Sequence, residues 1–233
     1  MRKFTYSALA CLGALAFIVM APDNAIAARL GLFHSKKSIG VNPKKGKAKF
    51  DSKKGVYAVT GSGANMWAKA DAFEFVYTKL SGDVTLTADI TFVGKGVEEH
   101  RKGALIVRQS LDPDSPYADA ALHGSGLTSL QYREAAGADT KEVQSSLKMP
   151  TRLRIERHGN QFTMYAGTGD DLKSSGPVTV EMKDPVYVGL AVTSHNANVV
   201  ETVLFSNVKL ESGQKQAASH LPLLSQMLVP VAK

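Results

Sequence analysis

The residues best suited to contact a ligand lie on three short strands predicted near the middle of the sequence. These strands are expected at 104–108, 118–123 and 127–133, with a proline- and aspartate-rich turn after the first and a glycine hairpin after the second. Side chains alternate along a strand, so Leu130 and Tyr132 face one way while Gln131 and Arg133 face the other. The unit therefore has one core face and one polar face.

The candidate ligand-binding residues are the polar side chains of this face and one aromatic residue at its rim: Arg108, His123, Gln131, Arg133, His195 and Trp67. Guanidinium and amide groups suit hydroxyl or carboxylate groups, and an indole can stack on a sugar ring. In the alternative interpretation, the arginines pair with acids such as Glu74 or Glu156 and Trp67 is buried. The histidines would then make ordinary hydrogen bonds near strand ends.

The sequence offers no catalytic residues. A glycoside hydrolase of a β-sandwich type needs two carboxylates beside one sugar bond, and no E-x-D-x-E-like strand occurs. The sequence also lacks G-x-S-x-G, and its only cysteine, Cys11, lies near the N-terminus. These absences favour a non-catalytic protein over an enzyme.

Calcium is the metal for which the sequence offers a candidate site. Asp112 and Asp114 supply loop oxygens of the kind that bind Ca²⁺, although Asp-Pro-Asp-Ser-Pro is also an ordinary turn composition. The six histidines are scattered without the spacing of zinc ligands. No other cofactor is expected.

The N-terminus has the pattern of an export signal. Arg2 and Lys3 precede an apolar run at 8–20, and Ala25-Ile26-Ala27 fits a cleavage site. We expect residues 1–27 to be a signal peptide cleaved near Ala27, which places the mature protein in the periplasm or outside the cell; an uncleaved anchor is the alternative. The mature chain then has no cysteine, so its stability must come from a core.

The positive charge is concentrated in residues 28–55. The whole chain carries a formal charge of +7, and this segment holds Arg29 and eight lysines between Lys36 and Lys54 against the single acid Asp51. We expect a basic N-terminal arm that could contact anionic surfaces, or else a solvated leader that aids solubility. Nucleic acid is not an expected partner, because the arm lacks interleaved aromatic residues.

The rest of the sequence predicts an all-β fold. Short strands recur with glycine or proline between them, residues 84–93 alternate cleanly, and no amphipathic helix is evident. The pattern is typical of a two-sheet antiparallel sandwich or jelly roll at 56–211. Residues 167–176 are expected to form a loop, and 212–233 a partly disordered tail.

Two stretches carry a resemblance to a known family: TGSGANMWAKADAFEFVYTKLSGDVTLTADI and KGALIVRQSLDPDSPYADAALHGSGLTSLQYR. Together with their surroundings, they resemble the concanavalin A-like lectin/glucanase superfamily. Within it, the chain is similar to a domain-of-unknown-function branch of exported bacterial proteins, some labelled Tol-type biopolymer transporter. The resemblance implies two antiparallel sheets and a concave face that receives carbohydrate in some relatives, but it fixes no reaction.

These observations predict an exported, non-catalytic module that binds a glycan or another cell-envelope polymer through the polar sheet face. A carbohydrate-active enzyme of the glycoside hydrolase type, on the same scaffold, is one alternative. The other is an envelope-associated structural or interaction protein tethered by its lysine-rich arm.

Overall fold

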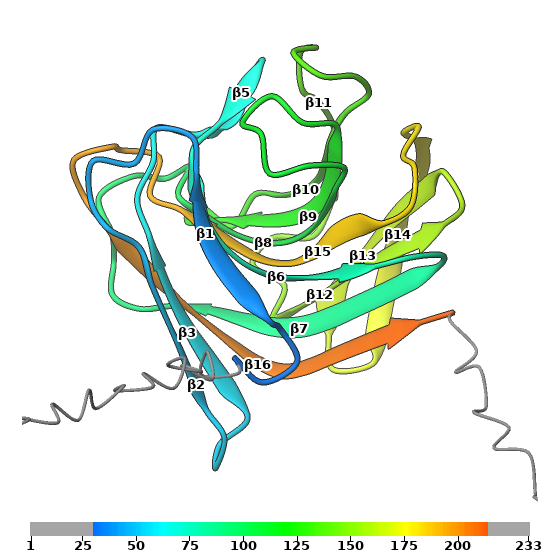
Figure 1. The fold of residues 1–233 in the computed structure, drawn as a ribbon. Coiled ribbons are helices and arrows are strands. Elements are labelled where there is room, and N and C mark those ends of the chain that lie inside the picture. Colours follow the sequence, from blue (N-terminus) through cyan, green and yellow to red (C-terminus); the bar gives the residue numbers. More distant parts are fainter. Residues whose placement is uncertain (1–29, 214–233) are drawn as a thin grey trace, which may run out of the picture.

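The computed structural model describes residues 30–213, which form two stacked antiparallel sheets (Figure 1). The upper sheet has the order β1 (Ser35–Ile39), β6 (Phe73–Leu80), β15 (Val186–Thr193), β8 (Lys102–Arg108), β9 (Tyr117–His123), β10 (Thr128–Arg133) and β11 (Lys141–Gln144). The lower sheet has the order β14 (Asp171–Thr179), β13 (Gln161–Thr168), β12 (Arg152–His158), β7 (Val84–Phe92), β16 (Glu201–Ser212), β3 (Val56–Gly61) and β2 (Lys47–Asp51). A small hairpin consists of β4 (Met66–Trp67) and β5 (Ala70–Asp71).

The prediction of a two-sheet antiparallel sandwich is confirmed. No helix occurs between residues 30 and 213, and hence none that is long and apolar enough to cross a membrane. The predicted signal peptide lies outside the described residues, as does the predicted tail beyond Gly213.

The main core lies between the two sheets because each strand turns alternate apolar side chains inward. Along β7, Val84, Leu86, Ala88 and Ile90 are buried in this core. Leu105 and Val107 of β8 meet them from the upper sheet. Burying one such side chain contributes about 1.5–3 kcal/mol, so this double layer supplies most of the stability of the domain.

The upper sheet is buried on its other face as well. Every residue of β8 and of β9 is buried, and a second apolar cluster including Met66, Phe73, Phe75 and Ile106 covers their outer side. Met66 belongs to the β4–β5 hairpin, which lies over this face. The expected open polar face is therefore largely covered by the hairpin.

The described part of the predicted arm, residues 30–55, is not free, because it contributes an edge strand to each sheet (Figure 1). β1 pairs with β6 and β2 pairs with β3. Lysines in β2 alternate with Ala48 and Phe50, which pack against the core, so a lysine-rich segment still buries one apolar side. The expected domain start at Val56 is wrong for this reason. The loop expected at 167–176 likewise includes the start of β14.

We predict that Phe33→Ala destabilises the domain by about 3–5 kcal/mol, because it leaves a cavity in the core. Phe33 is fully buried and packs edge-to-face on Tyr57 with ring centroids 5.4 Å apart. Urea denaturation measures the loss. The matched control, Leu32→Ala, removes a side chain that is 45% exposed and should change the free energy of unfolding by less than about 0.5 kcal/mol. Equal stability of both variants would mean that residues 30–55 do not belong to the folded domain.

Candidate functional site

A buried carboxylate anchors the β4–β5 hairpin to the upper sheet. Asp71, at the end of β5, accepts hydrogen bonds from Nη2 of Arg133 at 2.7 Å and from Nη1 of Arg133 at 2.9 Å. Nη1 of Arg108 lies 3.5 Å from the same carboxylate. Burial raises the pKa of Asp71, and the hydrogen bonds from Arg133 and the charges of both arginines oppose that rise.

The same contacts correct the prediction that Arg108 and Arg133 bind ligand. Both side chains are fully buried, and their guanidinium groups lie over the rings of Phe73 and Tyr117. Their remaining donors are used as well. Arg133 donates to the backbone carbonyls of Ala68, Ala138, Pro113 and Ser115, and Arg108 donates to those of Ser110 and Asp112. The two arginines are therefore structural, with Asp71 rather than Glu74 or Glu156 as the acid.

The candidate calcium ligands form part of this support. The carbonyl of Asp112 accepts from Arg108, and its carboxylate accepts from the hydroxyl of Ser110 at 2.9 Å. The carbonyl of Asp114 accepts from the backbone amide of Gly137 at 2.9 Å. Within residues 30–213, no three His, Cys, Asp or Glu side chains are arranged to hold a metal ion together. The turn thus positions Arg108.

A cleft of about 200 Å³ opens beside the hairpin, at the His123 end of β9. It brings together four of the predicted site residues: Trp67, His123, Gln131 and His195. Its other lining residues are Asn65, His100, Lys102, Leu127 and Glu142. The candidate site is therefore this cleft rather than the whole sheet face.

A directed chain of hydrogen bonds forms the floor of the cleft. Lys102 donates from Nζ to Oε1 of Gln131 at 3.2 Å, which fixes the orientation of the amide because an ammonium group only donates. Nε2 of Gln131 then donates to Nε2 of His123 at 3.2 Å. His123 must carry its proton on Nδ1, from which it donates to Nδ1 of His100 at 3.2 Å. One cation thus sets the tautomer of both histidines.

His123 is held neutral by its surroundings. It is 3% exposed, and burial, together with the charge of Lys102, lowers its pKa to about 3. Burial also lowers the pKa of His195, whose ring lies 5.4 Å from that of His100. Both ring nitrogens of His123 have hydrogen-bond partners, Nδ1 with His100 and Nε2 with Gln131. His123 and His100 therefore form a hydrogen-bonded pair, and the ring of His195 lies against His100.

Two ionisable groups of this region are buried, namely Lys102 of the floor and Asp119. Lys102 is 2% exposed and uses its other donors on Oδ1 of Asn65 at 2.9 Å and the carbonyl of Met66 at 2.8 Å. Burial lowers its pKa to about 8. Asp119 is fully buried, neither carboxylate oxygen has a hydrogen-bond partner among the described residues, and burial raises its pKa to about 8. Burial therefore disfavours the charged form of both Lys102 and Asp119.

Trp67 forms the wall between two concavities. Its half-buried indole lines the cleft on one side and, on the other, a wider groove of about 430 Å³ that also includes Val41 and Pro113. Nζ of Lys102 lies 5.6 Å from the indole centroid. Ala68, in the hairpin turn, has a left-handed φ of 49°, and its carbonyl accepts from Arg133. Arg133 therefore also helps to fix the position of the Trp67 indole.

Sequence reasoning missed several cleft residues. Lys102 pairs directly with His123 in the β8–β9 register, so extending the first predicted strand by two residues would have found it. Asn65 lies two positions before Trp67, and no sequence pattern marked it as a site residue. Glu142 lies on β11, a short strand of mostly polar residues without apolar alternation.

Comparison with known proteins identifies the fold but no family. No protein-family model matches the sequence, and a search of the curated proteins finds no match. A functionally unknown protein from Saccharomyces cerevisiae has a similar structure, with a TM-score of 0.57 and 12% identity over 74% of this chain and 94% of that one. At this identity the likeness concerns the fold alone.

Two further solved structures are similar at lower TM-scores. They are the carbohydrate-binding module CBM66 from Bacillus subtilis (TM-score 0.47, 18% identity, 76% of this chain and 95% of that one) and the lectin UEA-II complexed with galactose (0.46, 10%, 76% and 98%). The chain itself has two stacked antiparallel sheets of seven strands each, the architecture of a jelly-roll sandwich. The resemblance to the concanavalin A-like superfamily, and within it to a Tol-type branch, stays a prediction.

We predict that Asp71→Asn destabilises the domain by about 3–5 kcal/mol, since it leaves two buried guanidinium groups without a counter-charge. The measurement is the free energy of unfolding from urea titration. Asp170→Asn is the matched control, because Asp170 pairs with Arg152 at 2.9 Å while its side chain is fully exposed. That variant should lose less than about 1 kcal/mol. Similar losses in the two variants would contradict the anchoring role of Asp71.

We also predict a loss of stability in acid that depends on His123. Its folded pKa of about 3 is below that of an unfolded histidine, so the unfolded chain takes up the proton first and stability falls as the pH drops below about 6.5. Between pH 7.5 and 5.0, His123 should account for about 2 kcal/mol. His123→Gln should remove this part of the loss, whereas His158→Gln, at an exposed histidine, should retain it. An unchanged pH dependence in His123→Gln would refute the assignment.

Proposed function

We propose that this protein is an exported, non-catalytic binding module that takes a sugar unit of a glycan or envelope polymer in the cleft beside Trp67. The observation that carries the proposal is the half-exposed indole at the wall of a cleft lined by amides and imidazoles. A volume of about 200 Å³ is suited to a single sugar ring rather than a longer segment. The export part rests on the basic start, apolar run and Ala25-Ile26-Ala27.

Support comes from the hydrogen-bonding groups that the cleft leaves unused. Lys102, Gln131 and His123 are fully engaged with one another and form a preorganised floor. Among residues 30–213, the amide nitrogen of Asn65 and Nε2 of His100 have no acceptor. Both can donate, and the carboxylate of Glu142 can accept. Sugar hydroxyls both donate and accept, and the apolar face of a sugar ring packs on an indole.

The acids around the cleft favour binding over hydrolysis. A hydrolase needs two carboxylates that reach one glycosidic bond. Glu142 lines the cleft, but Asp119 is fully buried and does not line it. Only one of the two carboxylates therefore reaches the cleft in this arrangement.

A carbohydrate-active enzyme is the second candidate, favoured by one feature of these same acids. Asp119 and Glu142 both pair with Gln131 in adjacent strands, which places their backbones about 9–10 Å apart by strand spacing, with both side chains on the same sheet face. Inverting glycosidases hold their two carboxyl groups about 6.5–9.5 Å apart, and a raised pKa at Asp119 suits a general acid. Such an enzyme would have to expose Asp119, which is fully buried here.

Glycan binding by the purified protein tests the proposal. We expect selective binding on a glycan array, confirmed by calorimetric titration, and a loss of about tenfold or more in affinity for Trp67→Ala, because the stacking face is removed. Tyr165→Ala, at a half-buried tyrosine on the outer face of the lower sheet, should bind like the wild type. Arg108 and Arg133 are unsuitable test positions, because their removal unbalances the buried cluster.

Absence of binding to any glycan, or equal binding by Trp67→Ala and the wild type, would contradict the cleft as a glycan site. Release of reducing ends from a bound glycan, abolished in Asp119→Asn and in Glu142→Gln, would instead establish the enzyme. A bound glycan that stays intact over the same period would support the module.

A further inference from the structure

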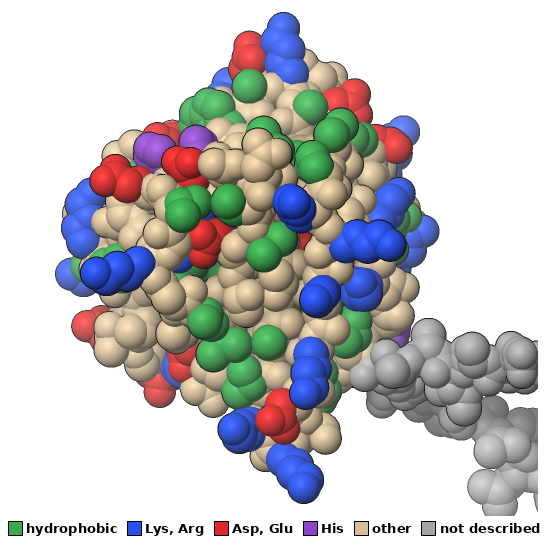
Figure 2. Space-filling model, turned by 90° about the vertical axis from the view of Figure 1, so that its left-hand side faces the viewer, with side chains coloured by type: hydrophobic (Ala, Val, Ile, Leu, Met, Phe, Trp, Pro, Cys, Tyr) green, Lys and Arg blue, Asp and Glu red, His purple; other side chains and the backbone are tan. Residues whose placement is uncertain are grey.

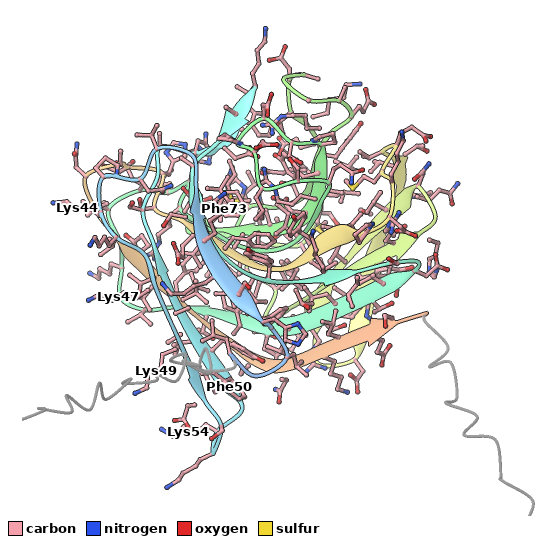
Figure 3. The ribbon with its side chains drawn as sticks, in the orientation of Figure 1. Lys44, Lys47, Lys49, Phe50, Lys54 and Phe73 are labelled. Carbon is pink, nitrogen blue, oxygen red and sulfur yellow. The ribbon has the colours of Figure 1, made fainter. Side chains whose placement is uncertain are left out.

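The lysines of residues 36–54 form a fixed strip along one edge of the sandwich. All eight are exposed: Lys36, Lys37, Lys44, Lys45, Lys47, Lys49, Lys53 and Lys54. Figure 3 shows Lys44, Lys47, Lys49 and Lys54 one after another along the edge strand β2, from the loop before it to the hairpin after it. Figure 2 views this side of the molecule and shows basic side chains gathering from its middle down to the protruding hairpin.

The spacing of the strip follows from the alternation of β2. Lys47 and Lys49 face solvent, while Ala48 and Phe50 face the core. Side chains two residues apart on one strand face lie about 7 Å from each other. The main strip is therefore a single row of ammonium groups, extended by Lys44 and Lys45 before the strand and by Lys53 and Lys54 after it.

The charge of this strip is largely uncompensated. Among residues 30–213, only Lys36 of these eight forms an ion pair, with Glu74 at 3.6 Å. The one acid inside the segment, Asp51, accepts from the backbone amides of Lys53 and Lys54 at 3.0 and 3.2 Å. Its carboxylate therefore shapes the hairpin turn without pairing with an ammonium group. A positive potential extends along the whole edge.

We propose that this strip binds a linear acidic polysaccharide laid along β2. A row one side chain wide matches a chain polymer that carries an anionic group on successive units, whereas a bilayer presents a plane. The segment offers no fully exposed aromatic ring on which nucleic-acid bases could stack, because Phe33 is buried and the half-buried Phe50 packs on Tyr57 at a centroid distance of 4.4 Å. The carboxylate or sulfate group is the feature recognised.

The position of the strip suits this role. Its upper end begins close to Gly40 and Val41, which line the groove on the outer side of Trp67. A polymer lying on β2 can therefore continue toward the hairpin. The strip does not need the cleft, however, since no lysine of the strip lines the cleft. Its test is accordingly separate from that of the proposed function.

Charged residues on an edge strand have another known role, which is to block pairing with a second sheet. β2 has β3 as its one neighbour in the lower sheet, so this role is physically reasonable. The two roles make different predictions for charge removal. Edge protection predicts self-association of the neutralised variant, and polymer binding predicts loss of affinity for polyanions.

The test compares two variants of equal charge in binding to size-defined polygalacturonate, dextran sulfate and neutral dextran. The strip variant carries Lys44→Gln, Lys47→Gln, Lys49→Gln and Lys54→Gln. The control variant carries Lys95→Gln, Lys148→Gln, Lys173→Gln and Lys183→Gln, all exposed and outside the segment. We expect wild-type protein to bind one or both polyanions and not neutral dextran. The strip variant should bind at least about tenfold more weakly and the control within about twofold of wild type.

Raising NaCl from 50 to 500 mM should weaken wild-type binding by about tenfold or more, because the charges are exposed. Preference between polygalacturonate and dextran sulfate identifies the anionic group. Protection of strip lysines, but not of Lys173 or Lys183, from amine methylation in the polymer complex supports the proposal without any substitution.

Several outcomes would overturn the proposal. They are equal binding by the strip and control variants, stronger binding of the wild type to phosphatidylglycerol vesicles or single-stranded DNA than to either polysaccharide, and self-association of the strip variant with no polyanion binding by the wild type. Loss of glycan binding in Trp67→Ala with intact polyanion binding separates this site from the cleft.

Discussion

A carboxylate shared with two buried guanidinium groups holds the β4–β5 hairpin over the upper sheet, and the architecture of the site depends on it. Arg133 donates twice to Asp71 and also to the carbonyl of Ala68 at the hairpin turn. The hairpin in turn supplies Trp67 to the cleft, and Met66, whose carbonyl accepts from Lys102. Without this anchor, the polar face of the sheet would be open and the cleft would have no wall. The desolvation cost of a buried ion pair offsets much of its contribution to stability, but here the pair fixes the position of the hairpin over the sheet.

The architecture could be read from the sequence wherever one strand face is apolar. The alternation in β7 and the short spacing of strands predicted the sandwich, because period-two burial is a local property. Four of the predicted site residues, Trp67, His123, Gln131 and His195, line one cleft. Arg108 and Arg133 were assigned a wrong role, because alternation shows which way a side chain points and not what covers it. The cover is the β4–β5 hairpin, whose Asp71 lies 37 positions before Arg108 and 62 before Arg133.

Two other differences have a common physical origin. In β2, lysines alternate with Ala48 and Phe50, so the segment is lysine-rich although one of its sides is apolar. The composition therefore suggested a free arm, whereas the chain forms an edge strand there. β14 has mostly exposed or half-exposed residues and lies at the opposite edge of the same sheet. Edge strands have fewer buried neighbours than central ones, and their sequences are correspondingly less constrained. Pattern-based reasoning is weakest where the sheets end.

The sequence distance between Asp71 and Arg133 has a consequence for the order of folding. The contact joins residues 62 positions apart and also requires the turn at 112–116 to be in place. Closing so long a loop is costly until the intervening strands have paired, so the anchor forms after β8, β9 and β10 have assembled. A chain whose strands have paired but whose hairpin has not docked on the upper sheet is therefore compact but has no cleft.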